Sequence, residues 1–266
     1  MKRDLYAEKR LSEALLNCSL FSKALCYESV GSTNDIAKEE ARRGAVEGTV
    51  VMAHEQTAGR GRMGRTFHSP LGDGLYMSLV LRLASCDNLG LITAGAAVSM
   101  RRAVYDVSGT WVDIKWVNDL LYEGKKLCGI LAEGQFSSEG DSLHIVLGVG
   151  INLRRPAMGY HPDIQGKTIS LEEINSTAEI DAIALAAAFI RQFSALYKAL
   201  PQADFLSEYK EACCLMGKEI RYQKEGITYR GRVMDIDDEA GLVIVNERGE
   251  REVLFMGEVS LVREDI

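Results

Sequence analysis

Residues 56–65 read Gln-Thr-Ala-Gly-Arg-Gly-Arg-Met-Gly-Arg, so three glycines alternate with three arginines directly after the apolar run Thr49–Ala53. Glycine lets a backbone approach a ligand closely, and the guanidinium of arginine grips carboxylates and phosphates with paired hydrogen bonds. The stretch therefore predicts a loop that folds over an anion and becomes ordered when an acidic small molecule binds. A solvated basic turn is the alternative, because most loops face water.

The same glycines, Gly59, Gly61 and Gly64, also satisfy the dinucleotide-binding pattern G-x-G-x-x-G. In a Rossmann fold that pattern opens a helix whose N-terminus receives the pyrophosphate. Residues 65–74 read Arg-Thr-Phe-His-Ser-Pro-Leu-Gly-Asp-Gly, which is typical of turns. This context excludes a Rossmann site, and the sequence contains no G-x-x-x-x-G-K-[ST] motif of a P-loop.

The composition is that of a globular protein without a general attraction for polyanions. The 266 residues carry 31 basic and 38 acidic side chains, for a net charge of −7. We therefore expect no nucleic-acid partner and no membrane partner. The six cysteines form no C-x-x-C pair and the four histidines are scattered, so neither a zinc site nor a disulfide framework is predicted. Because no signal peptide or long apolar run is visible, we expect a cytoplasmic location.

Apolar periodicity predicts an α+β fold with a mixed or mainly antiparallel sheet. Helices are predicted at 5–17, 36–43, 91–107, 178–200 and 204–215, and strands at 25–30, 49–55, 74–83, 111–116, 126–133 and 143–153. From residue 217 onward, short alternating segments separated by turns predict a small β-barrel. We place the domain boundary near Met216, which divides a catalytic domain, residues 1–216, from a barrel domain, residues 217–266.

Polar residues gather where these predicted elements end. Ser32, Thr33 and Asn34 follow a strand and open a helix, while residues 115–119, Lys-Trp-Val-Asn-Asp, end another strand. We expect a hairpin to bring this corner beside Lys126, whose ammonium can neutralise a carboxylate or a phosphoryl group. Asn118 and Asp119 can hold a nucleotide or Mg²⁺. An ordinary type I turn with an exposed lysine pair explains the same residues equally well.

Two weaker signals stay open. Gly148 and Gly150 interrupt an apolar strand, which indicates close approach of a ligand or of another backbone. A bulge or tight packing against a helix explains the glycines equally well. His54 adjoins the loop, but a lone histidine on a strand is more often structural, so we assign it no catalytic role.

In this order, the motifs resemble those of the biotin protein ligases. The resemblance rests on Ser32-Thr33-Asn34, Gln56 with Gly59–Arg65, Lys115-Trp116-x-Asn118-Asp119, Lys126-x-x-Gly129-Ile130-Leu131-x-Glu133, Gly148-x-Gly150-x-Asn152 and Gly257-Glu258-Val259-Ser260-Leu261. It runs from about residue 25 to the end of the chain. It implies a catalytic domain of the class II aminoacyl-tRNA synthetase and biotin ligase type, followed by an SH3-like β-barrel.

The resemblance also implies an activity. MgATP and biotin would form biotinyl-5′-AMP, and biotin would then pass to one lysine of a biotin carboxyl carrier protein or domain. Ser32, Thr33, Asn34, Gln56 and Gly129 would line the biotin pocket, and Gly59, Arg60, Gly61 and Arg62 would form the loop over biotin and adenylate. Lys126 would bridge the biotin carboxylate and the α-phosphate, with Arg60 and Arg62 as further catalytic cations. Arg65, Phe67, Asn118, Asp119, Gly148 and Asn152 would contact the nucleotide, and Asp119 the metal.

Three positions depart from the family pattern. Phe67 stands where a tryptophan that packs on adenine is usual, and Val117 where a proline is usual. Val262 stands where some members carry arginine, with Arg263 beside it. Because phenylalanine still offers a ring face, we expect weaker nucleotide contact and a retained function.

Other readings remain. A lipoate-protein ligase-like adenylating enzyme would share the fold, and a non-catalytic biotin or nucleotide sensor would bind without releasing pyrophosphate. About 25 residues precede the resemblance, too few for a DNA-reading winged helix, so no repressor function is expected. The chain can be a monomer or a homodimer.

Overall fold

The computed structural model describes residues 1–83, 89–136, 143–177, 180–200, 202–224 and 226–262. The helices are α1 (Leu5–Ala14), α2 (Thr33–Arg42), α3 (Leu89–Ser108), α4 (Leu171–Ile174), α5 (Ala182–Lys198) and α6 (Leu206–Ala212), with a short 3₁₀ turn, η1, at Arg62–Gly64. The strands are β1 (Lys23–Tyr27), β2 (Thr49–Ala53), β3 (Gly74–Leu83), β4 (Asp113–Lys115), β5 (Asp119–Tyr122), β6 (Lys125–Phe136), β7 (Leu143–Asn152), β8 (Glu219–Lys224), β9 (Ile227–Ile236), β10 (Leu242–Asn246), β11 (Arg251–Leu254) and β12 (Val259–Leu261). Residues 178 and 179 of a predicted helix, and Arg263, lie outside the described residues.

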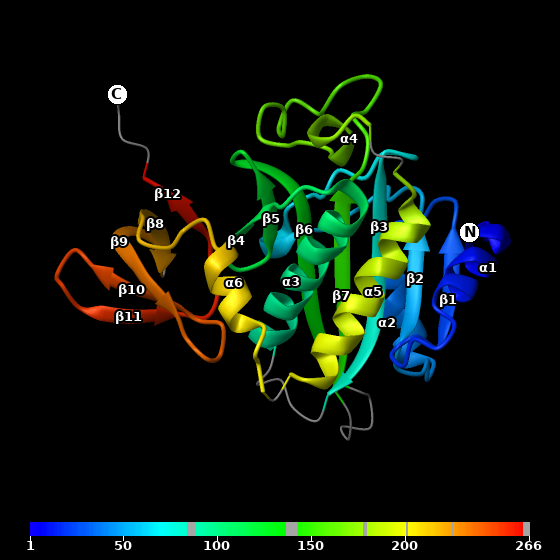
Figure 1. Ribbon diagram of the computed structural model, residues 1–266, viewed down its shortest axis with the longest axis horizontal. Coiled ribbons are helices and arrows are strands. Elements are labelled where there is room, and N and C mark those ends of the chain that lie inside the picture. The colour runs from blue at the N-terminus through cyan, green and yellow to red at the C-terminus, as the bar shows by residue number, and fades with distance from the viewer. Residues whose placement is uncertain (84–88, 137–142, 178–179, 201, 225, 263–266) are drawn as a thin grey trace.

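A seven-stranded sheet in the order β1-β2-β3-β7-β6-β5-β4 forms the centre of the larger part of the molecule. Only β1 and β2 pair in parallel, and the other neighbours are antiparallel, so the predicted mixed sheet is confirmed. Helices α3 and α5 cover one face and α2 the other (Figure 1). The described residues include no helix long and apolar enough to cross a membrane.

Successive side chains along each strand point to opposite faces of the sheet, so the apolar core is divided between the two faces. On β2, Val50 and Met52 pack with the side chains of α3 and α5 in the main core. Val51 and Ala53 point the other way and pack with Ala37 of α2. This two-residue period holds α2, and with it the polar start of that helix, against the middle of the sheet.

The C-terminal part is a five-stranded antiparallel sheet in the order β11-β10-β9-β8-β12. This arrangement is compatible with the predicted SH3-like barrel. The two sheets meet beside α6 (Figure 1). There the indole N–H of Trp116 donates a hydrogen bond of 2.9 Å to the carbonyl oxygen of Ala240. Ile220, Val233 and Leu242 from the second sheet belong to the same apolar cluster as the main core.

The structure corrects several predicted elements. Residues 117–125 were predicted as a connection, but they contain β5, which separates β4 from β6 in the sheet. Four residues are too few to show a period, and the reversal at Glu123 and Gly124, with φ of 49° and 74°, is a tight hairpin turn. Helix α2 begins at Thr33, earlier than predicted, and α4 and β12 were not predicted.

Candidate active site

A cavity of about 520 Å³ lies where the 56–69 loop, the start of α2, the β4–β5 corner and the β11–β12 connection meet. All of the site residues proposed from the sequence line it, except Gly59. Gly59 shapes the loop instead, because its carbonyl oxygen accepts from the Phe67 amide and a side chain would collide with the Phe67 carbonyl oxygen. The structure thus brings together proposed site residues that are up to 120 positions apart in the sequence, from Ser32 to Asn152.

At the start of α2, side chains connect the helix to the loop. The Gln56 amide oxygen accepts from the backbone amide and the hydroxyl of Thr33 at 2.8 and 3.0 Å. The Gln56 amide nitrogen donates to the Ser69 hydroxyl at 2.9 Å. Ser32 occupies the N-cap of α2 and makes no capping hydrogen bond there. Its hydroxyl is therefore not needed to cap the helix and can face a ligand.

A second polar chain crosses the sheet surface beneath α2. The Ser78 hydroxyl lies 2.6 Å from the amide oxygen of Asn34, and the Asn34 amide nitrogen donates to Glu133 at 2.7 Å. Lys38 donates to the other carboxylate oxygen of Glu133 at 2.6 Å. Burial raises the pKa of Glu133, but the hydrogen bonds from Lys38 and Asn34 outweigh burial and leave the pKa below its ordinary value. Glu133 is therefore an anion at neutral pH.

Each arginine of the loop has oxygen partners within the protein, which offset the repulsion between the three like charges. Arg60 pairs with Asp35 at 2.6 Å and with Glu133 at 3.5 Å. Arg62 donates to the Asn118 side-chain oxygen at 3.1 Å and to the Gly257 carbonyl at 3.2 Å. Burial lowers the pKa of Arg62 from its ordinary value.

Arg65 reaches across to the C-terminal sheet. It pairs with Glu258 through its two terminal guanidinium nitrogens, in one case at 2.8 Å. The loop therefore contacts both parts of the molecule, at Asp35 and Glu133 on one side and at Gly257 and Glu258 on the other.

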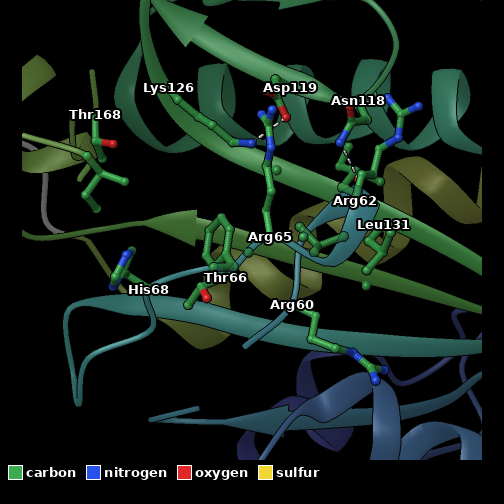
Figure 2. Close-up of a pocket in the computed structure, with 18 of the residues that line it drawn as sticks. Arg60, Arg62, Arg65, Thr66, His68, Asn118, Asp119, Lys126, Leu131 and Thr168 are labelled. Atoms are coloured by element: carbon green, nitrogen blue, oxygen red, sulfur yellow. Dashed lines mark hydrogen bonds and ion pairs between the residues drawn. The ribbon is translucent and has the colours of Figure 1, made fainter. Parts of the chain in front are cut away.

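On the opposite wall, Lys126 of β6 extends its ammonium to within 2.6 Å of the Asp119 carboxylate of β5 (Figure 2). Asn118 is fixed by a 2.8 Å hydrogen bond from its amide nitrogen to the Ile130 carbonyl. Asn152 donates to the carbonyls of Lys126 and Ile169 at 3.4 and 3.3 Å. The β5–β6 hairpin therefore presents a cation and a carboxylate to the cavity, and Asn118 at the β4–β5 corner and Asn152 at the end of β7 add amides.

The glycines in β6 and β7 make room for two side chains above the sheet. A Cβ on Gly150 would lie 2.5 Å from the Phe67 ring, and one on Gly129 would lie 3.3 Å from it. A Cβ on Gly148 would lie 2.2 Å from the Asn34 amide oxygen. At Gly148 the approaching side chain belongs to helix α2, which is the tight packing against a helix that the sequence left open, and at Gly150 it belongs to the 56–69 loop.

Several residues of the site carried no recognisable signal in the sequence. Lys167 and Thr168 come from the 154–170 segment, which showed no motif, and Met77 is an ordinary strand residue. Glu133 belongs to a quoted motif but received no role. A lone polar residue in a strand, such as Ser78, was a detectable signal for the hydrogen-bonded side chains beneath α2.

The sequence also gave no reason to connect the scattered histidines, and for two of them the structure does. His68 and His161 stack with ring centroids 4.3 Å apart, and Asp163 adjoins them. His54 instead contacts Asp4 at 2.8 Å, in keeping with a structural role.

Comparisons with known proteins agree with this geometry. Residues 26–152 match the model of the biotin/lipoate A/B protein ligase family. The chain is similar to the bifunctional ligase/repressor BirA of Bacillus spizizenii, with 32% identity over 90% of this chain and 74% of that protein. The chain belongs to the biotin protein ligase family.

Other biotin protein ligases show the same relationship. The biotin--[acetyl-CoA-carboxylase] ligase of Mycobacterium tuberculosis is 29% identical over 88% of this chain and 86% of that protein. Among solved structures, the biotin protein ligase of Aquifex aeolicus in complex with biotin and ATP superposes with a TM-score of 0.76. It is 26% identical, and the match covers 92% of this chain and all of that one. The similarity extends through both sheets of this biotin protein ligase family member.

Proposed function

We propose that this chain catalyses the reaction of a biotin protein ligase. It attaches biotin to a lysine of a biotin carboxyl carrier domain and consumes ATP in doing so. The observation that carries the proposal is the single cavity onto which Arg60, Arg62 and Lys126 converge beside the buried polar start of α2. Two anions, a carboxylate and a triphosphate, repel each other, and fixed cations lower the cost of bringing them into contact. The Aquifex aeolicus relative was solved with biotin and ATP.

The biotin end of the cavity is assigned to the start of α2 and to Gln56. Ser32, Thr33 and Asn34 are each less than 5% exposed, and they offer hydroxyl, amide and backbone groups over the middle of an apolar sheet. A small ligand with a polar head and an apolar chain suits such a lining. Gly59, Gly61 and Gly129 would let the loop and the sheet lie close to the ligand.

The first step forms one bond and breaks one bond. A biotin carboxylate oxygen attacks the α-phosphorus of ATP, and pyrophosphate leaves with the bonding electron pair, which gives biotinyl-5′-AMP. Lys126 exchanges its present partner, Asp119, for the carboxylate and the α-phosphate, where its charge stabilises the crowded negative transition state. Arg60 and Arg62 close the other side of the site.

In the second step, the neutral amine of the acceptor lysine attacks the acyl carbon and AMP leaves, with loss of one proton from the amine. The closed 56–69 loop would keep water from the mixed anhydride until the lysine arrives. No covalent bond to this chain is required in either step.

Nucleotide contacts are assigned to Arg65, Phe67, Asn118, Gly148 and Asn152. Mg²⁺ favours oxygen ligands and commonly binds one or two carboxylates together with phosphates. Asp119 supplies such a carboxylate beside Lys126, so the donor set fits, and the ion would screen the phosphate charge. We also assign catalysis to residues 1–216 and place a second domain at residues 217–266.

The decisive experiment measures pyrophosphate release by the purified chain with MgATP and biotin, beside lipoate and no-acid controls. A biotin carboxyl carrier domain is then added, and the labelled lysine is located by mass spectrometry. We expect biotin-dependent release and a single labelled lysine. Lipoate-dependent release would assign the chain to lipoate ligation instead, and biotin binding without release would identify a sensor.

A further inference from the structure

Two loops that are distant in sequence place two imidazoles and a carboxylate side by side at the rim of the cavity. His68 lies near the end of the 56–69 loop, while His161 and Asp163 come from the connection between β7 and α4. One potential ligand atom from each of the three residues lies within 4.8 Å of the other two. Figure 2 shows His68 on the same side of the cavity as Thr168. The activity proposed above uses none of these three side chains.

The spacing of His161 and Asp163 suits a metal ion, and the His68 ring, now stacked on His161, would turn to bring its lone pair to the same point. The Nδ1 atom of His161 and a carboxylate oxygen of Asp163 are 3.3 Å apart. Ligand atoms about 2.0–2.1 Å from a tetrahedral Zn²⁺ ion are separated by roughly 3.3 Å, so this pair already has the separation of two zinc ligands. The Asp163 amide donates a long 3.3 Å hydrogen bond to the same nitrogen, and a metal ion would replace that weak contact.

The backbone holds the three residues in place. His161 and Asp163 flank Pro162, whose ring fixes one torsion of the short segment, and the His161 carbonyl accepts from the amides of Ile164 and Gln165 at 2.9 and 3.0 Å. On the other loop, His68 lies between Phe67, packed against Gly150, and Ser69, bonded to Gln56. Both halves of the cluster are therefore positioned by contacts that do not involve a metal.

We propose that His68, His161 and Asp163 form a site for a late first-row divalent cation, with Zn²⁺ as the natural candidate, which clamps the 56–69 loop to the 154–170 segment at the cavity rim. Two nitrogens and one oxygen leave a fourth position for water. Imidazole ligands select Zn²⁺ and its neighbours over Mg²⁺, which prefers oxygen. The site is therefore distinct from the Mg²⁺ position assigned to Asp119.

The test uses the imidazole NMR signals of the full chain, which has only four histidines. Each signal is assigned by a single substitution, and ZnCl₂ is titrated into the metal-free protein with MgCl₂ as a parallel probe. We expect the signals of His68 and His161 to shift together, saturating at one Zn²⁺ per chain, while those of His54 and His144 stay in place. MgCl₂ should move none of them.

Three variants test the ligands by chelator competition. His161→Ala, His68→Ala and the conservative Asp163→Asn should each weaken Zn²⁺ binding by more than about 10-fold, the loss that even indirect partners of a metal cause. His54→Gln is the matched control and should bind like the wild type. Because Asp163 is exposed, its variant is expected to fold normally. The proposal is overturned if the imidazoles do not shift at one equivalent of Zn²⁺, or if binding persists in these variants, which would assign the ion to cysteines.

Discussion

At the scale of single residues, the site is a set of cations paired with carboxylates that an anionic substrate can replace. Lys126 and Arg60 are paired with side chains that are partly exposed, and such pairs contribute only about 0–1 kcal/mol each to stability. Binding of an anionic substrate can therefore replace Asp119 or Asp35 at small cost to the fold. For the same reason, a substitution of Lys126 or Arg60 should change catalysis more than it changes the free energy of unfolding.

Lys126→Ala should lower the rate of biotin-dependent pyrophosphate release by about 100-fold or more, because a fixed charge at the developing transition state is lost. The melting temperature should change little, since the Lys126–Asp119 pair is partly exposed. Lys125→Ala is the matched control, because Lys125 is an exposed neighbour that does not line the cavity. If the Lys126 variant adenylates biotin at the normal rate, Lys126 has no place in the mechanism.

Gly150→Ala tests the position of Phe67. The new methyl group would lie 2.5 Å from the ring, so the ring must move, at an overpacking cost of about 1–3 kcal/mol. If the ring stacks on adenine, the KM for ATP should rise about 2- to 10-fold, the equivalent of one aromatic contact, while the KM for biotin stays constant.

The control is Gly31→Ala, because a Cβ on Gly31 meets nothing within 4 Å. Steady-state kinetics with each substrate varied in turn, together with thermal melts, measures both effects. An unchanged KM for ATP in a folded Gly150→Ala variant would show that the position of this ring does not matter to the nucleotide.

Much of the candidate site was visible in the sequence because glycines and arginines in a loop have few purposes other than close approach and anion binding. The motifs containing Arg60, Asn118 and Lys126 do line one cavity. Their present partners could not be predicted, because the pairing of Arg65 with Glu258 depends on how the two sheets meet. The His68–His161 stack was invisible for the same reason, since nothing in either loop points to the other.

At the scale of elements, the helix ends show where structure and function compete. Asp4 caps α1, accepting from the amides of Tyr6 and Ala7 at 3.1 and 2.9 Å. Asp181 caps α5 in the same way. Ser32 stands at the equivalent position of α2 without such a bond. The two purely structural helices carry the stronger caps, and the helix that opens onto the cavity leaves its capping hydroxyl available.

Asp4→Ala should lower the free energy of unfolding by about 1 kcal/mol at pH 7. The amide of Ala7, followed by the hydrogen bond with His54, holds the pKa of Asp4 below its ordinary 3.8. The unfolded chain therefore takes up the proton first as the pH falls. The stabilising effect is fully present above about pH 4 and is lost as the pH falls through the lower folded-state pKa.

Urea denaturation of the wild type and the Asp4→Ala variant at pH 7, 5, 4 and 3 measures this difference. Asp4→Asn is the matched control, because asparagine caps a helix well but does not titrate. A stability difference between wild type and Asp4→Ala that stayed constant down to pH 3 would contradict the assigned role of this carboxylate.

Long periodic segments were predicted best. Helix α3 and strands β3, β6 and β7 follow the apolar pattern closely, because ten or more residues show a period clearly. The short strands β5 and β12 were missed, since three or four residues cannot show one and their pairing comes from neighbouring strands. The order of the strands, with β7 between β3 and β6, is a long-range property that no local pattern contains.

At the scale of the whole molecule, the two sheets share one apolar cluster and a buried hydrogen bond. Trp116, which is 3% exposed, belongs to the larger part and donates to Ala240 in the smaller one. Loss of the smaller sheet would leave the indole N–H and the apolar side chains around it in contact with water. The change in sequence pattern at residue 217 therefore indicates a sharper boundary between the two parts than their packing does.

We accordingly expect the two sheets to unfold in a single transition. The chain has two tryptophans, and the second, Trp111, is 48% exposed and stacks on Tyr105. Trp111→Phe keeps an aromatic ring there and leaves Trp116 as the sole fluorescent indole, located at the contact between the sheets. In urea, the fluorescence of this variant and its far-ultraviolet circular dichroism should then give coincident transitions, because neither sheet can lose its partner without exposing buried apolar surface. A fluorescence change at a clearly lower urea concentration than the loss of circular dichroism would mean that the smaller sheet separates first. The 56–69 loop could then lose its contacts with Gly257 and Glu258 while the larger sheet stays folded.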